Sequence, residues 1–218
     1  MDDERLDIPV DYVRFRQRED RSGYIVDRFG ACLADSILDV GCDQAVLKRL
    51  LPQVRYVGLD IGGAPDLKLD LDGLERLPFE DGSFHCVVCS DVLEHLEHLH
   101  RMFGELIRVA RRYVVLSLPN CWVAARVPIQ RGRGEFAHYG LPVDPPPDRH
   151  RWFFSLQQAR HFVHAQARRH TNVRIAQERI TEKPRFVLLR ALRRLRYRAR
   201  FDYANRYAHT YWAVLEKT

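Results

Sequence analysis

Between residues 36 and 118 the apolar positions form short runs, separated by longer stretches in which apolar and polar residues follow a helical period. Short apolar runs bounded by turn residues are typical of buried strands, and the amphipathic stretches are typical of helices. The predicted elements are strand 36–40, helix 44–51, strand 55–60, strand 67–70, strand 84–90, helix 97–110 and strand 112–118. Strands that alternate with helices predict an α/β fold, with a mostly parallel sheet covered by helices on both faces.

The flanking segments continue the pattern less regularly. Residues 10–34 predict an amphipathic helix that is broken near Ser22 and Gly23. A helix is expected at 156–169, a strand near 172–180 and a final strand at 209–218. Residues 120–151 show neither period, and a long irregular stretch inside a compact domain is usually a functional loop. We interpret it as a substrate lid with basic and aromatic side chains, a solvated surface excursion being the alternative.

Composition limits the classes of protein. At 218 residues and 46% hydrophobic content, the chain is long enough to bury one substantial core, so we expect a single domain. No apolar run approaches the roughly 18 residues of a membrane span, and the acidic start lacks the plan of a signal peptide. The expected location is the cytoplasm. Five cysteines do not suggest a disulfide framework, and Cys86 and Cys89 would point to opposite faces of one strand as buried thiols.

The net charge of +6 is concentrated near the end of the chain, where residues 181–218 hold ten basic and three acidic residues. Residues 183–201 contain no acid and predict a basic helix, with Leu188, Leu192, Leu195 and Ala199 on one narrow face. Three interpretations remain open: peripheral contact with an anionic membrane face, contact with nucleic-acid phosphates, or docking of the apolar stripe on the domain. The chain has no recognisable nucleic-acid-binding motif, so we do not expect nucleic acid as a partner.

Candidate chemistry begins where the first two core strands end. Strand 36–40 runs into a turn at Gly41, and strand 55–60 ends on Asp60. A glycine turn allows close approach of a ligand to the backbone, and a carboxylate about 20 residues later can accept hydrogen bonds from ribose hydroxyls. The turn has one glycine and an added carboxylate, Asp43, which suits a cationic ligand better than a pyrophosphate. S-adenosylmethionine, an adenosine with sulfonium and ammonium groups, has that character.

Four blocks in order then resemble the class I S-adenosylmethionine-dependent methyltransferases, in particular the small methyltransferase-domain and MetW-like branch. The blocks are LDVGC at 38–42, GLDI at 58–61, LPFEDGSF at 77–84 and CSDVLEHL at 89–96. The resemblance implies a Rossmann-like, doubly wound sheet of seven strands, mostly parallel, whose last strand is an antiparallel edge. The implied parts of one domain are an N-terminal helical cap (1–34), a cofactor-binding core (35–119), the lid (120–151) and a C-terminal part (152–218).

The resemblance also implies roles for individual residues. The cofactor would be held by Asp39, Gly41, Cys42, Asp43, Asp60, Ile61, Asp72, Gly73 and Ser90. Among these, Gly41 and its neighbours would line the methionine end, Asp60 would bind the ribose, and Asp72 with Gly73 would flank the adenine. Asp43 and Ala45 stand where the family usually has glycine. Aspartate tolerates a left-handed backbone and alanine suits a helix start, so we interpret the turn as altered but usable.

The transfer itself requires positioning and a base for the acceptor proton. The candidate catalytic residues are Asp91 and His95, directly after strand 84–90, and His150 after the lid. In a helical turn Asp91, Glu94 and His95 would share one face, which resembles the E-x-x-E-H metal site of ubiquinone-type and small-RNA-terminal O-methyltransferases. Metal-free members of the wider family share D-V-L-E-H-L, and we assign no metal.

The sequence therefore predicts an S-adenosylmethionine-dependent methyltransferase. Its acceptor would be an oxygen or nitrogen of a small molecule or of a lipid-linked or glycan-linked envelope intermediate. The alternative is a non-catalytic binding or regulatory protein that keeps the fold with a degenerate cofactor turn.

Overall fold

A computed structural model of the chain describes residues 8–136, 138–146, 148–197 and 200–218. Within them, eight strands form one sheet in the order β1-β7-β8-β6-β5-β2-β3-β4. The strands are β1 (Val10–Tyr12), β2 (Ser36–Val40), β3 (Arg55–Asp60), β4 (Leu67–Lys68), β5 (Phe84–Ser90), β6 (Ala110–Pro119), β7 (Val173–Glu182) and β8 (Ala208–Lys217). Only β8 runs antiparallel, to β6 and β7, so the other seven strands end at one edge of the sheet.

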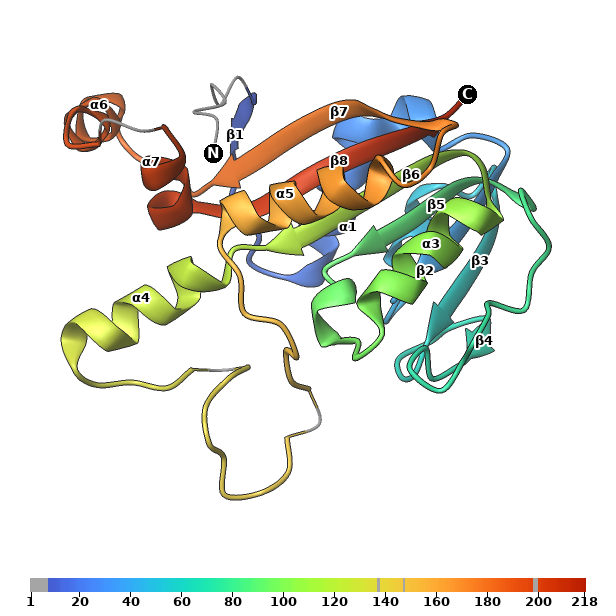
Figure 1. Cartoon of the computed structure of the whole chain (residues 1–218), viewed down its shortest axis with the longest axis horizontal. Coiled ribbons are helices and arrows are strands. Elements are labelled where there is room, and N and C mark those ends of the chain that lie inside the picture. Colours follow the sequence, from blue (N-terminus) through green and yellow to red (C-terminus); the bar gives the residue numbers. More distant parts are fainter. Residues whose placement is uncertain (1–7, 137, 147, 198–199) are drawn as a thin grey trace.

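Helices cover both faces of this sheet. They are α1 (Arg18–Phe29), α2 (Val46–Leu50), α3 (Leu99–Val109), α4 (Cys121–Arg131), α5 (Leu156–Ala167), α6 (Val187–Leu195) and α7 (Arg200–Tyr207), with short 3-10 turns η1 (Gly30–Cys32) and η2 (Leu93–His95). Helices α3 and α5 lie in front of the sheet in Figure 1, and α1 lies behind it. Two apolar clusters result, one under α3 and α5 and one under α1 and α2. Cys86 belongs to the second cluster and Cys89 to the first, which confirms that they are buried thiols on opposite faces.

The predicted α/β sheet with an antiparallel last strand is confirmed, with two corrections. Strand β8 is not an edge strand, because it is inserted between β6 and β7. Its side chains are buried on both faces, with Tyr211 and Trp212 fully enclosed. The predicted number of seven strands was wrong because Val10–Tyr12 adds an eighth, pairing with β7 from Val10 opposite Ile180.

Three segments outside the core also differ from expectation. Helix α1 runs without a break through Ser22 and Gly23, whose missing side chain faces open space. Residues 121–131 of the expected lid form helix α4, capped by the Asn120 side chain, and the rest of the lid hangs below the sheet. The basic segment contains two helices, α6 and the start of α7, instead of one.

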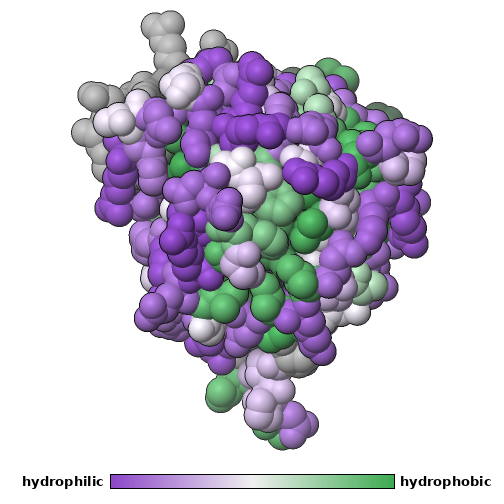
Figure 2. Space-filling model, turned by 90° about the vertical axis from the view of Figure 1, so that its right-hand side faces the viewer, coloured by the Kyte–Doolittle hydropathy of each residue, from purple (hydrophilic) through white to green (hydrophobic). Residues whose placement is uncertain are grey.

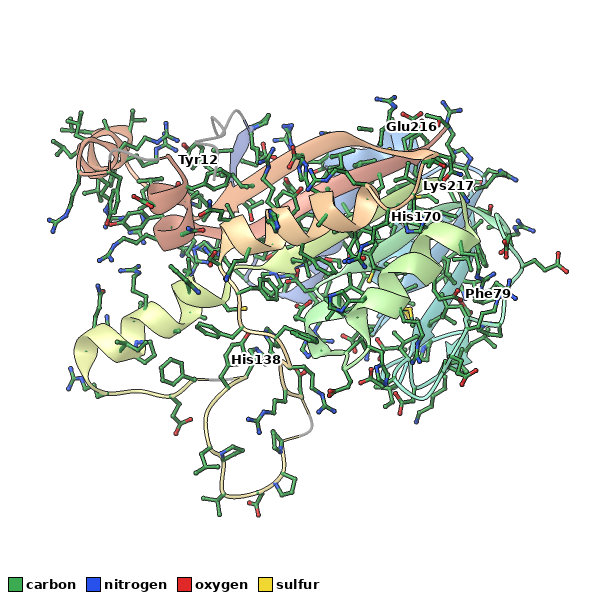
Figure 3. All side chains as sticks on the ribbon, viewed as in Figure 1. Tyr12, Phe79, His138, His170, Glu216 and Lys217 are labelled. Carbon is green, nitrogen blue, oxygen red and sulfur yellow. The ribbon has the colours of Figure 1, made fainter. Side chains whose placement is uncertain are left out.

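Helix α6 points its basic face toward the domain and its apolar face toward solvent, the reverse of the usual arrangement. Its arginines face the domain: the Arg190 guanidinium lies 3.6 Å from the centre of the Tyr12 ring, and that of Arg194 lies 5.4 Å from Tyr203. Figure 3 shows Tyr12 beside this helix. The apolar stripe faces outward, with Leu188 73% and Leu195 83% exposed. Docking of the stripe on the domain is therefore wrong for these residues; Ala199 lies outside the described residues.

Apolar surface also occurs elsewhere. In Figure 2 a hydrophobic area ringed by hydrophilic residues occupies the middle of the face at the β3–β4 end of the molecule. None of the described helices is both long and apolar enough to cross a bilayer.

Candidate cofactor and acceptor site

A cavity of about 1500 Å³ opens at the edge where the parallel strands end. Its wall includes all but one of the predicted site residues: Asp39, Gly41, Cys42, Asp43, Asp60, Ile61, Asp72, Ser90, Asp91, His95 and His150. Gly73 does not line it. Residues from the turns after β2, β3 and β5 thus meet because parallel strands share one carboxyl edge.

The turn after β2 is built around left-handed backbone. Gly41 has φ of +80°, and the two residues that replace the usual glycines, Asp43 and Ala45, have φ of +45° and +49°. The expectation that Ala45 begins the helix in helical conformation is wrong, because helix α2 starts one residue later and Ala45 is left-handed. A side chain at Gly41 has no room, since its Cβ would lie 2.1 Å from Val92 Cγ2.

Asp60 fixes this turn from the end of β3. One carboxylate oxygen accepts the N–H of Asp43 at 2.8 Å, and the other accepts the N–H of Gly62 at 3.0 Å. Each oxygen keeps capacity for a second hydrogen bond, which ribose hydroxyls can supply. The neighbouring Ile61 is 64% exposed although it lines the cavity, so it offers an apolar surface to a flat ring.

Three other acidic residues of the wall, Asp43, Asp72 and Asp39, have partners within the protein. Asp43 forms an ion pair with Arg18 at 2.5 Å, which reduces the field that it directs at a cationic ligand. The Asp72 carboxylate accepts the N–H groups of Glu97 and His98 at 3.1 and 3.3 Å, and so holds the turn before α3. Asp39 accepts the Tyr56 hydroxyl at 2.6 Å. Burial raises the pKa of Asp39 to about 7, and burial raises that of Cys42 to about 12.

Asp91 does not share a helical face with Glu94 and His95. It has φ of +50° and precedes the 3-10 turn η2, so the predicted i, i+3, i+4 arrangement does not form. Its carboxylate accepts the Ser117 hydroxyl at 2.5 Å and pairs with Arg21 of α1. Ser117 also contacts Ser90, with 3.0 Å between the hydroxyl oxygens. These contacts make Asp91 a link between α1, β5 and β6.

Three histidines gather beneath the strand ends, around the position of His138 in Figure 3. The ring centres of His95 and His150 are 4.5 Å apart, and those of His138 and His150 are stacked at 4.2 Å. His95 Nδ1 lies 2.7 Å from an Asp148 carboxylate oxygen, and His150 Nδ1 lies 2.8 Å from the Tyr139 hydroxyl. Burial and the neighbouring histidines lower the pKa of His150 to about 3, so its ring is neutral.

Glu94 lies against this cluster and is 1% exposed. Neither of its carboxylate oxygens has a hydrogen-bond partner among the described residues, and burial followed by the charge of Asp91 raises its pKa. One donor atom each from Glu94, His95 and His150 lies within 4.8 Å of the others. A carboxylate with two imidazoles suits Zn²⁺, Mn²⁺ or Fe²⁺, so these residues can hold such a cation.

The buried carboxyl predicts a pH-dependent stability. A raised folded-state pKa means that Glu94 stabilises the fold below about pH 4.5 and that this contribution is lost as the pH rises toward the folded pKa. We expect Glu94→Gln to raise the free energy of unfolding at pH 8 and to leave it unchanged at pH 4. Denaturant titrations at both pH values measure this.

A cation at the cluster gives the opposite result. Mn²⁺ or Zn²⁺ bound by Glu94 would keep the carboxylate charged, and micromolar metal would then stabilise the native chain but not the Glu94→Gln variant. In the presence of a chelator, a stability difference between the native chain and Glu94→Gln that is the same at pH 4 and at pH 8 would contradict the assignment of a raised pKa.

Several wall residues were missed from the sequence. Arg21, Asp148, Arg206 and His209 lie far from the motif blocks along the chain and reach the site only through the fold. The excess of arginine over residues 181–218 was the one signal for Arg206, and it did not indicate that this residue lies beside the motif blocks.

Comparison with known proteins agrees with this geometry. A family model described as a methyltransferase domain matches residues 12–166, so the chain belongs to the methyltransferase-domain family. No curated protein sequence matches the chain significantly.

Solved structures share the fold at low identity. The small RNA methyltransferase HEN1 superposes with a TM-score of 0.60 at 15% identity, over 95% of this chain and 26% of that chain. The chain thus spans about a quarter of the length of HEN1. Magnesium protoporphyrin IX methyltransferase from Synechocystis PCC 6803, with bound SAH, gives 0.53 at 16% identity, over 95% and 89%. The [4+2]-cyclase SpnF gives 0.57 at 12% identity, over 98% and 88%. These likenesses concern the fold, which has been adapted to different reactions.

Proposed function

We propose that the protein is a catalytically active S-adenosylmethionine-dependent methyltransferase. The main observation behind this proposal is that the left-handed turn at Gly41, Asp60 and Ile61 lie together on one cavity wall, where Asp60 is hydrogen-bonded to the turn. The cofactor is S-adenosylmethionine, as expected for the family. Asp60 offers acceptors for ribose hydroxyls and Ile61 offers an apolar surface for adenine. Gly41 and Ser90 would border the methionine end.

The chain's own residues account for the remaining requirements of the reaction. When bound, the cofactor supplies a methyl group on a cationic sulfur. Displacement of that group requires an aligned acceptor and removal of its proton. His95 is the proposed base because Asp148 holds its Nδ1, which orients Nε2 toward the cavity side occupied by Glu94. His150, neutral and held by Tyr139, would position the acceptor beside it. Asp91 would hold the cavity wall through Arg21 and Ser117.

Release of labelled product tests the catalytic part of the proposal. The protein is incubated with methyl-labelled S-adenosylmethionine and a small-molecule and lipid extract. Transfer of the label to a component of the extract and formation of unlabelled S-adenosylhomocysteine are both followed. We expect turnover that falls at least about a hundredfold in His95→Gln, the range for loss of a general base. His161→Gln is the matched control, because His161 does not line the cavity. If the protein bound the cofactor but showed no turnover with any fraction of the extract, a binding or regulatory role would be favoured.

We also propose that the outward face of α6 contacts the surface of an anionic membrane. Its outward leucines can enter the headgroup region, and Arg196, which is exposed at the end of the helix, supplies attraction to anionic lipid. Leu188→Gln with Leu195→Gln is expected to reduce sedimentation with phosphatidylserine vesicles at least about tenfold, since each buried leucine contributes roughly 1.5–3 kcal/mol. Leu141→Gln with Val143→Thr, in the loop at the bottom of Figure 1, removes apolar side chains that are even more exposed and serves as the control. Equal binding of both double variants, or no preference for anionic vesicles, would remove this contact.

A further inference from the structure

The end of the cavity opposite the cofactor turn is strongly basic. It is walled by Arg126 of α4, by Arg206 and Tyr207 at the end of α7, and by His209 at the start of β8, and Lys183 and Arg185 lie on the same wall. Helices α4, α6 and α7 lie together at the left of Figure 1. This end faces the acceptor side of the site, since the residues proposed for the cofactor come from the turns after β2, β3 and β5.

Three guanidinium groups surround one aromatic ring there. The guanidinium carbons of Arg193, Arg126 and Arg206 lie 4.9, 5.4 and 5.9 Å from the centre of the Tyr207 ring. Like charges held this close repel one another unless a negative group lies between or beside them. The ring attracts each cation but cannot neutralise three of them.

One described carboxylate, that of Asp202, lines a second cavity together with Arg126 and Arg206, but it forms no ion pair with either of them. None of Arg126, Arg193, Arg206, Lys183 and Arg185 forms an ion pair with a described carboxylate. The Nε atoms of Arg126 and Arg206 and one terminal nitrogen of Arg193 are buried and have no hydrogen-bond partner among the described residues. Buried donors without partners are costly, which indicates that a ligand satisfies them.

His209, at the start of β8, is also affected by the excess of positive charge at this end of the cavity. Burial, together with the charges of Lys183, Arg185 and Arg126, lowers its pKa to about 4. Every charged neighbour that shifts it is a cation.

An apolar cavity adjoins this basic end. It has a volume of about 510 Å³, and its apolar lining comes from Trp122, Ala125, Ile129 and Phe153. Arg126, Arg206 and the carboxylate of Asp202 lie on the same wall. Trp122 and Ile129 are 46% and 66% exposed, so this apolar surface is open to a ligand. Arg126 and Arg206 therefore stand between the two cavities, with the proposed methyl-transfer site on one side and an apolar compartment on the other.

We propose that the methyl acceptor is an amphiphilic anion, whose phosphate or carboxylate binds Arg126 and Arg206 and whose apolar part enters the cavity beside Trp122. This proposal rests on the proposed function, because it assigns the substrate class of the same site. Arginine suits the role, since its planar group binds phosphate and carboxylate through paired hydrogen bonds. Arg193 adds charge from α6 to the same group.

Short amphiphiles below their micelle concentration test the proposal. Calorimetry of the full chain compares octyl phosphate, octanoate, octanol and inorganic phosphate. We expect octyl phosphate or octanoate to bind at least tenfold more tightly than octanol, and octyl phosphate to bind more tightly than inorganic phosphate. The order of octyl phosphate and octanoate identifies the anionic group. Quenching or enhancement of Trp122 fluorescence, absent in Trp122→Phe, places the apolar part.

Charge-neutral variants separate the site from general basicity. Arg126→Gln and Arg206→Gln should each weaken octyl phosphate about tenfold and leave octanol and S-adenosylmethionine binding unchanged. Arg131→Gln is the matched control, because Arg131 ends the same helix and lines neither cavity. Equal binding of octanol and octyl phosphate, or an equal loss in Arg131→Gln, would overturn the proposal.

Failure of the proposed function gives a different result. A chain that binds octyl phosphate through Arg126 but does not bind S-adenosylmethionine would retain the anion site and lose the methyltransferase activity. A chain that binds S-adenosylmethionine and shows no preference for the anionic amphiphiles would keep the activity and lose this substrate class.

Discussion

Replacement of Asp60 by alanine is expected to weaken S-adenosylmethionine binding by about 1.5–3 kcal/mol, or roughly 10- to 150-fold in the dissociation constant. The variant removes the proposed acceptor of the ribose hydroxyls. It also frees the N–H groups of Asp43 and Gly62, so the turn that lines the cofactor pocket loses its anchor. Calorimetric titration of the folded variant measures the loss.

A control variant must distinguish loss of a cofactor contact from loss of a carboxylate that accepts a backbone N–H group. Asp66 provides it, because its carboxylate accepts the N–H of Gly58 at 2.9 Å on the same strand and pairs with Lys48, yet it does not line the cavity. Asp66→Ala should lower thermal stability and leave the dissociation constant of S-adenosylmethionine unchanged. Unchanged binding in Asp60→Ala would exclude Asp60 from the cofactor site.

Gly41→Ala is expected to lower the free energy of unfolding by about 2–5 kcal/mol. The left-handed backbone at φ +80° costs a non-glycine residue roughly 1–2 kcal/mol, and the new Cβ, 2.1 Å from Val92 Cγ2, adds an overpacking cost of about 1–3 kcal/mol. Denaturant-induced unfolding of the variant measures the sum.

Two further variants divide that sum into its parts. Combining Gly41→Ala with Val92→Ala should recover the overpacking part and leave the backbone part, which appears as a coupling energy in a double-mutant cycle. Gly23→Ala is the control, because Gly23 lies within α1 with nothing near its missing side chain and should gain stability. Additive losses at positions 41 and 92 would show that the two residues do not meet as described.

Strand positions in the core were predictable from the sequence because buried parallel strands are continuous apolar runs. Strand β3 and strand β5 begin and end where the pattern placed them, at Arg55–Asp60 and Phe84–Ser90. The cavity wall at this edge also followed from the strand ends, since Gly41, Asp60 and Ser90 each come directly at a strand terminus. Local pattern and fold agree there.

Other parts depended on contacts that no local pattern reveals. Helix α4 contains Pro128, and its apolar residues are not confined to one face. It is capped by Asn120, whose side chain also donates to the Asn205 and Ala208 carbonyl oxygens. The outward leucines of α6 contradict the usual rule: the arginines of this helix stack on Tyr12, Tyr203 and Tyr207, and the apolar stripe stays exposed. The left-handed backbone at Ala45 is imposed by the turn and runs against the preference of alanine.

The central claim, that the cavity at the strand ends binds S-adenosylmethionine, is tested most directly by calorimetric titration of the unmodified chain with S-adenosylmethionine and S-adenosylhomocysteine. We predict saturable binding of both at one site per chain, lost in large part in Asp60→Ala and kept in Asp66→Ala. Binding of neither ligand to the folded chain would contradict the claim.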